Sequence, residues 1–248
     1  MTRKKSFIDS LPGHALALAD VLRLRDDWAE GGRLSDIEDE WHRVRHRWFL
    51  ISCAVAMSVF ILTLYGYGVG GQYVDSMKAP SGTDFVLQWL PVVDVTWVLS
   101  YLWLAMQLFA VVTVFLFAPR RVPFIFATVS LFVVIRTVFL VLTPLGPPLQ
   151  NIDMTVLNPL FSQGKGVLAF NNENFFSGHT GVPFLLFLLH RPKWLKAVFL
   201  FFSVLMGTCV LLARNHYTMD VIGAFFMTYA IYRLGLVLFG RLDHPASR

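Results

Sequence analysis

Six apolar stretches, separated by short polar or basic segments, limit this chain to one class of fold. They lie at about 48–65, 92–117, 123–142, 176–189, 194–212 and 217–239. A helix needs about 20 residues to cross the hydrocarbon core of a bilayer, and all but the fourth stretch approach or exceed that length. The pattern predicts an all-α polytopic membrane protein with about six transmembrane helices in a bundle.

Charged residues are few and unevenly placed. They make up 15% of the chain, against roughly a quarter in a soluble domain, and they concentrate in the first 47 residues and in short loops. A net charge of +5 would suggest nucleic-acid binding in a soluble protein, but in a membrane protein clustered Arg and Lys more often record orientation. We therefore expect membrane lipids, and no nucleic acid, as partners.

The composition divides the chain into three parts. Residues 1–47 are predicted to form a charged N-terminal extension, residues 48–240 a six-helix membrane catalytic domain, and residues 241–248 a short tail. In the extension, Ser35 and Glu38 have the spacing of a capping box, and residues 14–28 suit a helix on the membrane surface. The extension is too long and too charged to open a cleavable signal peptide, so we expect the first span to be retained.

Arginine and lysine residues indicate which loops face the cytoplasm. With six spans, the basic clusters all fall on one side of the membrane: Arg43, Arg45 and Arg47; Arg120 and Arg121; Arg191, Lys193 and Lys196; Arg233 and Arg241. The opposite loops, 66–91, 143–175 and the turn near Arg214, are poorer in basic residues. Because basic loops stay cytoplasmic, both termini are predicted to be cytoplasmic and the opposite loops exoplasmic.

Polar side chains gather at the exoplasmic ends of the predicted spans. Four segments far apart in the sequence contribute them: Asp94; Arg136; Ser177, Gly178 and His179; Arg214, His216 and Asp220. A charged side chain within a span costs about 3 kcal/mol or more and is usually paired and functional. The convergence of cations, imidazoles and carboxylates predicts a functional site.

These residue types suit phosphoryl transfer. His216 and Asp220 are four residues apart, so on a helix they share one face about 6 Å apart. The carboxylate can accept the Nδ1 proton and make Nε2 more nucleophilic, while His179 protonates the leaving alcohol. Guanidinium, hydroxyl and helix-start N–H groups can hold the phosphate oxygens: Arg136, Arg214, Ser177 and Gly178.

Two alternatives to phosphoryl transfer are open for these residues. Glu173, both histidines and Asp220 could together bind zinc. Two nearby arginines favour an anion over a dication, so we expect no metal and no other cofactor. In the second alternative, the charges line a pathway in a non-enzymatic lipid transporter, in which case His216→Ala would leave any lipid phosphotransfer intact.

At these positions the sequence resembles the sphingomyelin synthase branch of the type 2 phosphatidic acid phosphatase and vanadium haloperoxidase superfamily. Residues 177–180 are similar to its Ser-Gly-His-Thr motif, and residues 216–221, preceded by Leu-Leu-Ala, to its His-Tyr-Thr-x-Asp-Val motif. More loosely, residues 90–94 match a Leu-Pro-x-x-Asp motif, and Arg136 with residues 142–145 resembles the arginine-bearing third span.

The resemblance implies a six-helix fold, an exoplasmic active site and a reaction without metal. Residue by residue, it makes His216 the nucleophile of a phosphohistidine intermediate, Asp220 its orienting carboxylate, and His179 a general acid and then base. Asp94 and Glu173 join the candidate substrate-binding residues. The chain departs from the branch at residues 171–173, where Asn-Asn-Glu replaces Cys-Gly-Asp, and at position 214, where arginine replaces histidine.

We therefore expect a transferase that moves a phospho-head group from a glycerophospholipid to ceramide or another lipid alcohol. The same chemistry with water as acceptor gives the main alternative, a lipid phosphate phosphatase. The motifs of those phosphatases are incomplete here: no Lys-x6-Arg-Pro string occurs in the corresponding place, and Val210 stands where they carry an arginine six residues before the last histidine.

Overall fold

The computed structural model describes residues 46–77, 79–153, 170 and 174–243. Within these residues the chain is all-helical, as predicted, and the only β pairing is an isolated bridge between Ser81 and Gly146. The main helices are α3 (Arg47–Ser76), α4 (Trp103–Phe117), α5 (Val122–Leu142), α8 (Gly178–Leu189), α9 (Lys193–Leu212) and α10 (Thr218–Asp243). Short helical turns accompany them: η2 (Leu87–Trp89), η3 (Val98–Leu102) and η4 (Pro119–Arg121).

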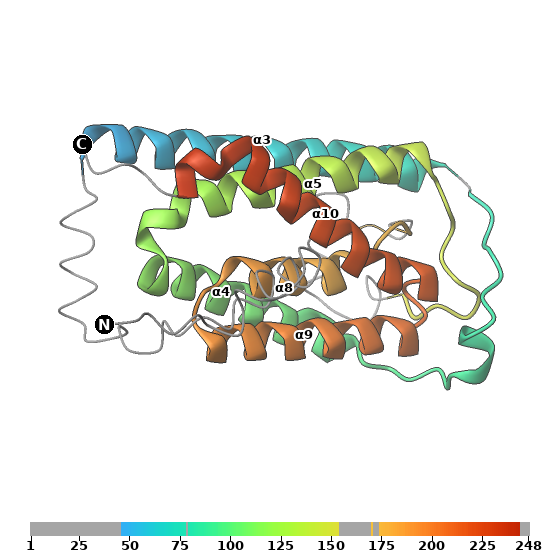
Figure 1. Ribbon diagram of the computed structural model, residues 1–248. Coiled ribbons are helices and arrows are strands. Elements are labelled where there is room, and N and C mark those ends of the chain that lie inside the picture. Colours follow the sequence, from blue (N-terminus) through green and yellow to red (C-terminus); the bar gives the residue numbers. More distant parts are fainter. Residues whose placement is uncertain (1–45, 78, 154–169, 171–173, 244–248) are drawn as a thin grey trace, which may run out of the picture. The chain divides into compact units, whose positions relative to one another are not determined.

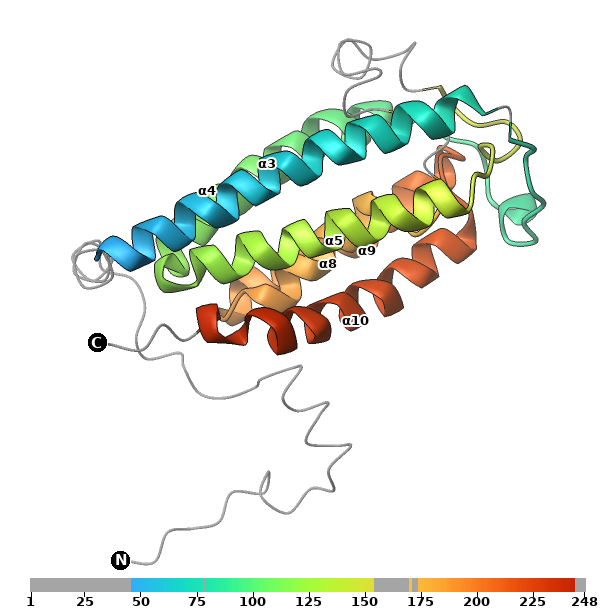
Figure 2. The same ribbon diagram turned by 90° about the horizontal axis from the view of Figure 1, so that it is seen from above.

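The helices alternate in direction along a single bundle (Figure 1). Helices α3, α5 and α9 run one way, and α4, α8 and α10 run the other. Helix α3 lies along α5, α8 packs against α9 and α10, and α10 also packs against α5 (Figure 2). Within the described residues, five helical segments are long and apolar enough to cross a membrane. The chain is an integral multi-pass membrane protein.

Helix α8, the one main helix outside these five segments, has only 12 residues, which gives it a length of about 18 Å. It is buried among the others through small side chains. A Cβ at Gly181 would meet Phe132 and the Thr228 hydroxyl at 2.9 Å, and one at Gly207 of α9 would meet Thr180 at 3.2 Å. Close helix approach through glycine is common in membrane bundles. Protein contacts therefore surround this short central helix.

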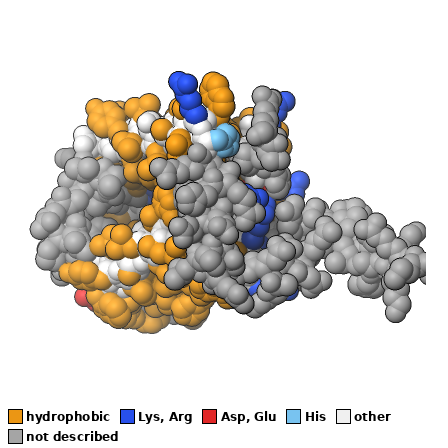
Figure 3. All heavy atoms as spheres, turned by 90° about the vertical axis from the view of Figure 1, so that its left-hand side faces the viewer, with side chains coloured by type: hydrophobic (Ala, Val, Ile, Leu, Met, Phe, Trp, Pro, Cys, Tyr) orange, Lys and Arg blue, Asp and Glu red, His pale blue; other side chains and the backbone are white. Residues whose placement is uncertain are grey.

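The two ends of the bundle differ in charge. The start of α3, the η4 turn, the 190–192 connection and the end of α10 share one end, here named the basic end (Figure 1). There Arg121 pairs with Asp243 and donates to the Leu189 carbonyl. Figure 3 looks onto this end and shows Lys, Arg and His side chains among apolar ones. The opposite end, formed by 79–97, 143–153, 174–177 and 213–217, is named the site end.

Helix α3 extends eleven residues further than the sequence suggested, because we expected a loop from residue 66 onward. The prediction was wrong because the glycines here serve packing and not a turn. A Cβ at Gly70 would meet the Thr137 methyl group at 2.8 Å, and one at Gly71 would collide with the Phe170 ring. The extension also carries Tyr67 to the level of the site described below.

Helix α4 starts later than predicted. Residues 92–95 are not helical, and the chain then passes through the π-helical turn η3 before α4 begins at Trp103. The Val93 N–H donates to the Leu212 carbonyl at 3.0 Å, which ties this approach segment to the end of α9.

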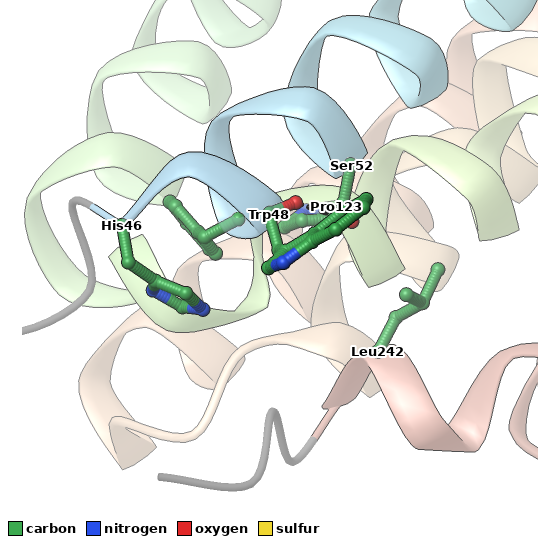
Figure 4. Close-up of a pocket in the computed structure, with 6 residues that line it drawn as sticks. His46, Trp48, Ser52, Pro123 and Leu242 are labelled. Carbon is green, nitrogen blue, oxygen red and sulfur yellow. Dashed lines mark hydrogen bonds between the residues drawn. The ribbon is translucent and has the colours of Figure 1, made fainter. Parts of the chain in front are cut away.

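A small hollow of about 120 Å³ lies at the basic end, between the start of α3, the start of α5 and the end of α10 (Figure 4). Its lining includes His46, Trp48 and Leu242. It is remote from the site end and contains none of the predicted site residues. The expected helices before residue 46, the predicted tail after 243 and Glu173 lie outside the described residues.

Candidate functional site

His216 and Asp220 form a buried pair at the site end. The Nδ1 atom of His216 lies 3.3 Å from Oδ2 of Asp220, and the two residues are 4% and 6% exposed. The sequence predicted this contact on one helix face, but His216 lies in the turn before α10. Asp220 occupies the first turn of α10, where a carboxylate is favoured by the helix dipole. The same Oδ2 accepts the Tyr217 N–H at 3.0 Å, which fixes the carboxylate.

The turn that carries His216 is a Schellman motif at the end of α9. The Asn215 N–H donates to the Val210 carbonyl at 2.9 Å and the Arg214 N–H to the Leu211 carbonyl at 3.1 Å. Such a motif places one residue in the left-handed region, usually glycine. Here that residue is Arg214, with φ of 57°. Holding a side chain there costs about 1 kcal/mol, and strain of this kind often accompanies function.

The start of α8 lies against the same turn. Ser177 caps this helix, because its Oγ accepts the Thr180 N–H at 3.3 Å. The Ser177 N–H in turn donates to the Asp220 backbone carbonyl at 3.0 Å, which joins the start of α8 to the first turn of α10. The following residues, Gly178 and His179, are thereby placed beside the His216–Asp220 pair.

Arg136 reaches this junction from α5. It is 5% exposed; its Nε donates to the Phe176 carbonyl at 3.3 Å and its Nη1 to the Tyr67 hydroxyl at 2.8 Å. A Cβ at Gly178 would meet the Arg136 Nε at 3.3 Å. The guanidinium therefore lies directly over the start of α8, where backbone N–H groups also favour an anion.

His179 completes the group. Its side chain is half-buried, and its ring centroid lies 4.6 Å from that of Trp103. The Leu99 backbone carbonyl faces the imidazole within hydrogen-bonding range, and His216 and Arg136 lie near enough to act on it electrostatically. Within the described part of the chain, the buried Nε2 of His179 has no hydrogen-bond partner.

Six predicted residues therefore lie together: Arg136, Ser177, Gly178, His179, His216 and Asp220. Arg214 lies at the edge of this group, where its guanidinium donates to the Leu90 carbonyl at 3.1 Å. Its Nε is buried and unpartnered among the described residues. Asp94 does not join the group. It is exposed, and the hydrogen bonds it accepts from Thr96 lower the pKa of its carboxyl.

Sequence reasoning missed a second carboxylate, Asp84, which holds α10 from the loop before η2. Asp84 accepts hydrogen bonds from the Thr218 N–H at 2.6 Å and from the Thr218 hydroxyl at 3.0 Å. A residue far away in the sequence therefore caps the first turn of α10. Partial burial acts to raise the pKa of Asp84, but hydrogen bonds from Thr218, Leu87 and Val86 outweigh burial and lower it. No local pattern in the sequence links residue 84 to residue 218.

Tyr217 was also missed, although it stands beside His216 in the motif. Its hydroxyl donates to the Gly146 carbonyl at 2.9 Å and accepts the Gly82 N–H at 2.7 Å, which joins two loops at the site end. Burial raises the pKa of the Tyr217 phenol. The hydroxyl is therefore neutral near pH 7 and able to donate.

No group of three or more His, Cys, Asp or Glu side chains within the described residues is arranged to hold a metal ion. The fold and the site define a multi-pass helical membrane protein with an imidazole–carboxylate pair, a second imidazole and a buried guanidinium at one end of the bundle. The model of a known protein family, the C-terminal part of the PAP2 superfamily, matches residues 173–235.

This match covers α8, α9 and most of α10, and with them both histidines and Asp220. It supports the PAP2 superfamily, whose members are phosphatases or phosphotransferases, and therefore supports an enzyme. The match does not distinguish the sphingomyelin synthase branch from the others. Comparison with curated proteins and with solved structures gives no match.

Proposed function

We propose that this protein is a phospholipid head-group phosphotransferase, which moves a phospho-head group from a glycerophospholipid to ceramide or another lipid alcohol. The observation that carries the proposal is the buried His216–Asp220 pair beside His179 and Arg136. A carboxylate that accepts the Nδ1 proton leaves Nε2 as the nucleophilic nitrogen.

The reaction has two steps. In the first, Nε2 of His216 attacks phosphorus, the P–O bond to diacylglycerol breaks, and His179 gives its proton to the departing oxygen. In the second, His179 takes the proton of the acceptor hydroxyl, whose oxygen attacks phosphorus while the P–N bond breaks. Both imidazoles return to their starting protonation states, so the cycle needs no metal or redox cofactor.

The cationic groups bind the phosphate. Arg136 and the N–H groups at Ser177 and Gly178 supply positive potential where the transferred group sits, and Arg214 contributes a guanidinium from the edge. Glu173 is proposed to contact the head group. The side of the membrane follows from charge: if the basic end is cytoplasmic, the site end is exoplasmic.

The test measures acceptor dependence. Purified protein in nanodiscs receives phosphatidylcholine or phosphatidylethanolamine labelled in the head group, or labelled phosphatidic acid, with and without ceramide or a diacylglycerol whose acyl chains differ from those of the donor. The proposal expects labelled product only with the lipid acceptor. Acceptor-independent release of inorganic phosphate from phosphatidic acid would instead identify a lipid phosphate phosphatase.

Two histidine variants separate the enzyme from a lipid transporter. His216→Ala should abolish transfer while the protein still folds, because it removes the nucleophile. His46→Ala is the matched control, since His46 lies at the basic end, far from the site, and it should keep wild-type activity. Full activity in His216→Ala would end the proposal.

A further inference from the structure

The π-helical turn before α4 leaves one carbonyl without its usual donor. In an α-helix the Leu99 carbonyl accepts the N–H of residue 103. Here the Trp103 N–H bonds to the Val98 and Ser100 carbonyls instead. The Leu99 carbonyl, on a fully buried residue, faces the His179 imidazole. Single π-turns inside α-helices are frequent at functional sites.

The side chain of Trp103 acts on the same imidazole. The ring centroids of Trp103 and His179 lie 4.6 Å apart at 46°, within the roughly 6 Å over which an aromatic face attracts a cation. The indole and the Leu99 carbonyl both favour a positive charge on His179. Burial of the ring opposes it most, followed by the charges of His216, from the turn before α10, and Arg136, from α5.

We propose that Trp103, which follows directly on the π-turn, is a positioning residue that orients His179 and favours the protonated form of its imidazole for proton donation. The inference rests on the proposed function for the role of His179. Without the aromatic face, burial and the charge of Arg136 would make His179 lose its proton at lower pH. The leaving oxygen would then lack its proton donor, while donor-lipid binding would be little affected.

The first test is the pH dependence of transfer in Trp103→Leu, Trp103→Phe and Trp103→Tyr. A cation–π contact of about 0.5–2 kcal/mol corresponds to about 0.4–1.5 pH units. In Trp103→Leu the fall in kcat on the alkaline side should move to lower pH by that amount, with KM nearly unchanged. Phe and Tyr should give smaller shifts, because tryptophan is the best of the three faces.

The control is Trp97→Leu. Trp97 precedes the same π-turn, but its side chain is 64% exposed, so this substitution should leave the pH profile unchanged. If Trp103→Leu does not fold, the aromatic variants test the same contact: the fall in kcat on the alkaline side should occur at higher pH in wild type than in Trp103→Tyr and Trp103→Phe. Lower activity with an unshifted pH profile in the Trp103 variants would overturn the proposal, because packing alone would explain the loss.

A second readout does not depend on turnover. Imidazole ¹⁵N shifts of His179 in nanodiscs, assigned with His179→Gln, report the protonated fraction between about pH 5 and 8. This fraction should be smaller in Trp103→Leu than in wild type at each pH. An equal fraction would overturn the role of Trp103, whereas wild-type protein without phosphotransfer activity would overturn the proposed function.

Discussion

Replacing Asp220 by asparagine isolates the charge of the His216–Asp220 pair. The amide oxygen of asparagine can take the position of Oδ2, which now lies 3.3 Å from His216 Nδ1 and 3.0 Å from the Tyr217 nitrogen. The backbone hydrogen bond in the first turn of α10 is then kept. Only the negative charge beside the imidazole is lost.

The size of the effect follows from the charge that develops on His216. Attack through Nε2 turns a neutral imidazole into a phosphorylated imidazolium, so the attraction to Asp220 grows toward the transition state. At 3.3 Å with an effective dielectric constant of about 20, the gross attraction is about 5 kcal/mol. This is an upper bound, because the asparagine dipole retains part of it. We expect kcat to fall by about 10²–10³, or about 3–4 kcal/mol.

The assay is single-turnover transfer from labelled donor lipid, with the thermal midpoint measured on the same preparation. Asp220→Asn should keep the wild-type midpoint. Asp220→Ala should lose at least as much activity and also about 1–2 kcal/mol of stability, because the Tyr217 N–H loses its acceptor. A wild-type kcat in Asp220→Asn would refute the reasoning, since the carboxylate would then serve only the helix start.

Two further predictions follow from single residues. Arg214→Gly should relieve about 1 kcal/mol of left-handed backbone strain and yet lower kcat/KM by about 10- to 100-fold, because a charged hydrogen bond to the phosphate is lost. Arg214→Lys should retain part of the kcat/KM that the glycine variant loses. Wild-type kinetics in Arg214→Gly would contradict a phosphate-binding role. At the basic end, burial lowers the pKa of His190 from 6.5 to about 4, so the unfolded chain binds a proton between these values that the folded protein excludes. The free energy of unfolding should therefore fall by up to about 3 kcal/mol as pH drops from 6.5 toward 4. In thermal unfolding, His190→Asn should show a smaller fall over this range. The same pH dependence of stability in wild type and His190→Asn would contradict the prediction.

The fold was predictable because its main signals are local. Six apolar stretches, five of them near membrane-spanning length, predicted the six main helices of the described residues, and the Ser-Gly-His and His-Tyr-Thr-x-Asp strings marked the starts of α8 and α10. The predicted helix ends were wrong where tertiary packing, and not the local sequence pattern, determines where a helix begins or ends. The glycines near residue 70 allow α3 to approach α5 and Phe170, so the helix continues where a loop was expected.

The sequence predicted most of the residues that lie together at the site, but it did not predict how they contact one another. The four-residue spacing of His216 and Asp220 suggested one helix face, whereas the contact forms between a Schellman turn and the following helix start. Asp84 lies in a loop without a motif signal, and Trp103 lies in an apolar span where nothing in the sequence distinguishes it from the other apolar residues. Their roles depend on which loops and turns meet at the bundle end, and only the assembled tertiary structure determines that.

The arrangement of helix ends explains why a phosphate fits here better than a cation. Helices α8 and α10 both start at the site end, so their N-terminal dipoles add positive potential to that of Arg136 and Arg214. Asp220 and Asp84, which accept hydrogen bonds at the start of α10, offset part of this potential there, whereas Arg136 and the start of α8 keep theirs. A dication would meet repulsion from the guanidinium groups and the start of α8, whereas a phosphate diester would gain from each. Vanadate, which resembles pentavalent phosphorus, should therefore inhibit transfer, and its inhibition should weaken in Arg136→Leu more than in a variant at the basic end.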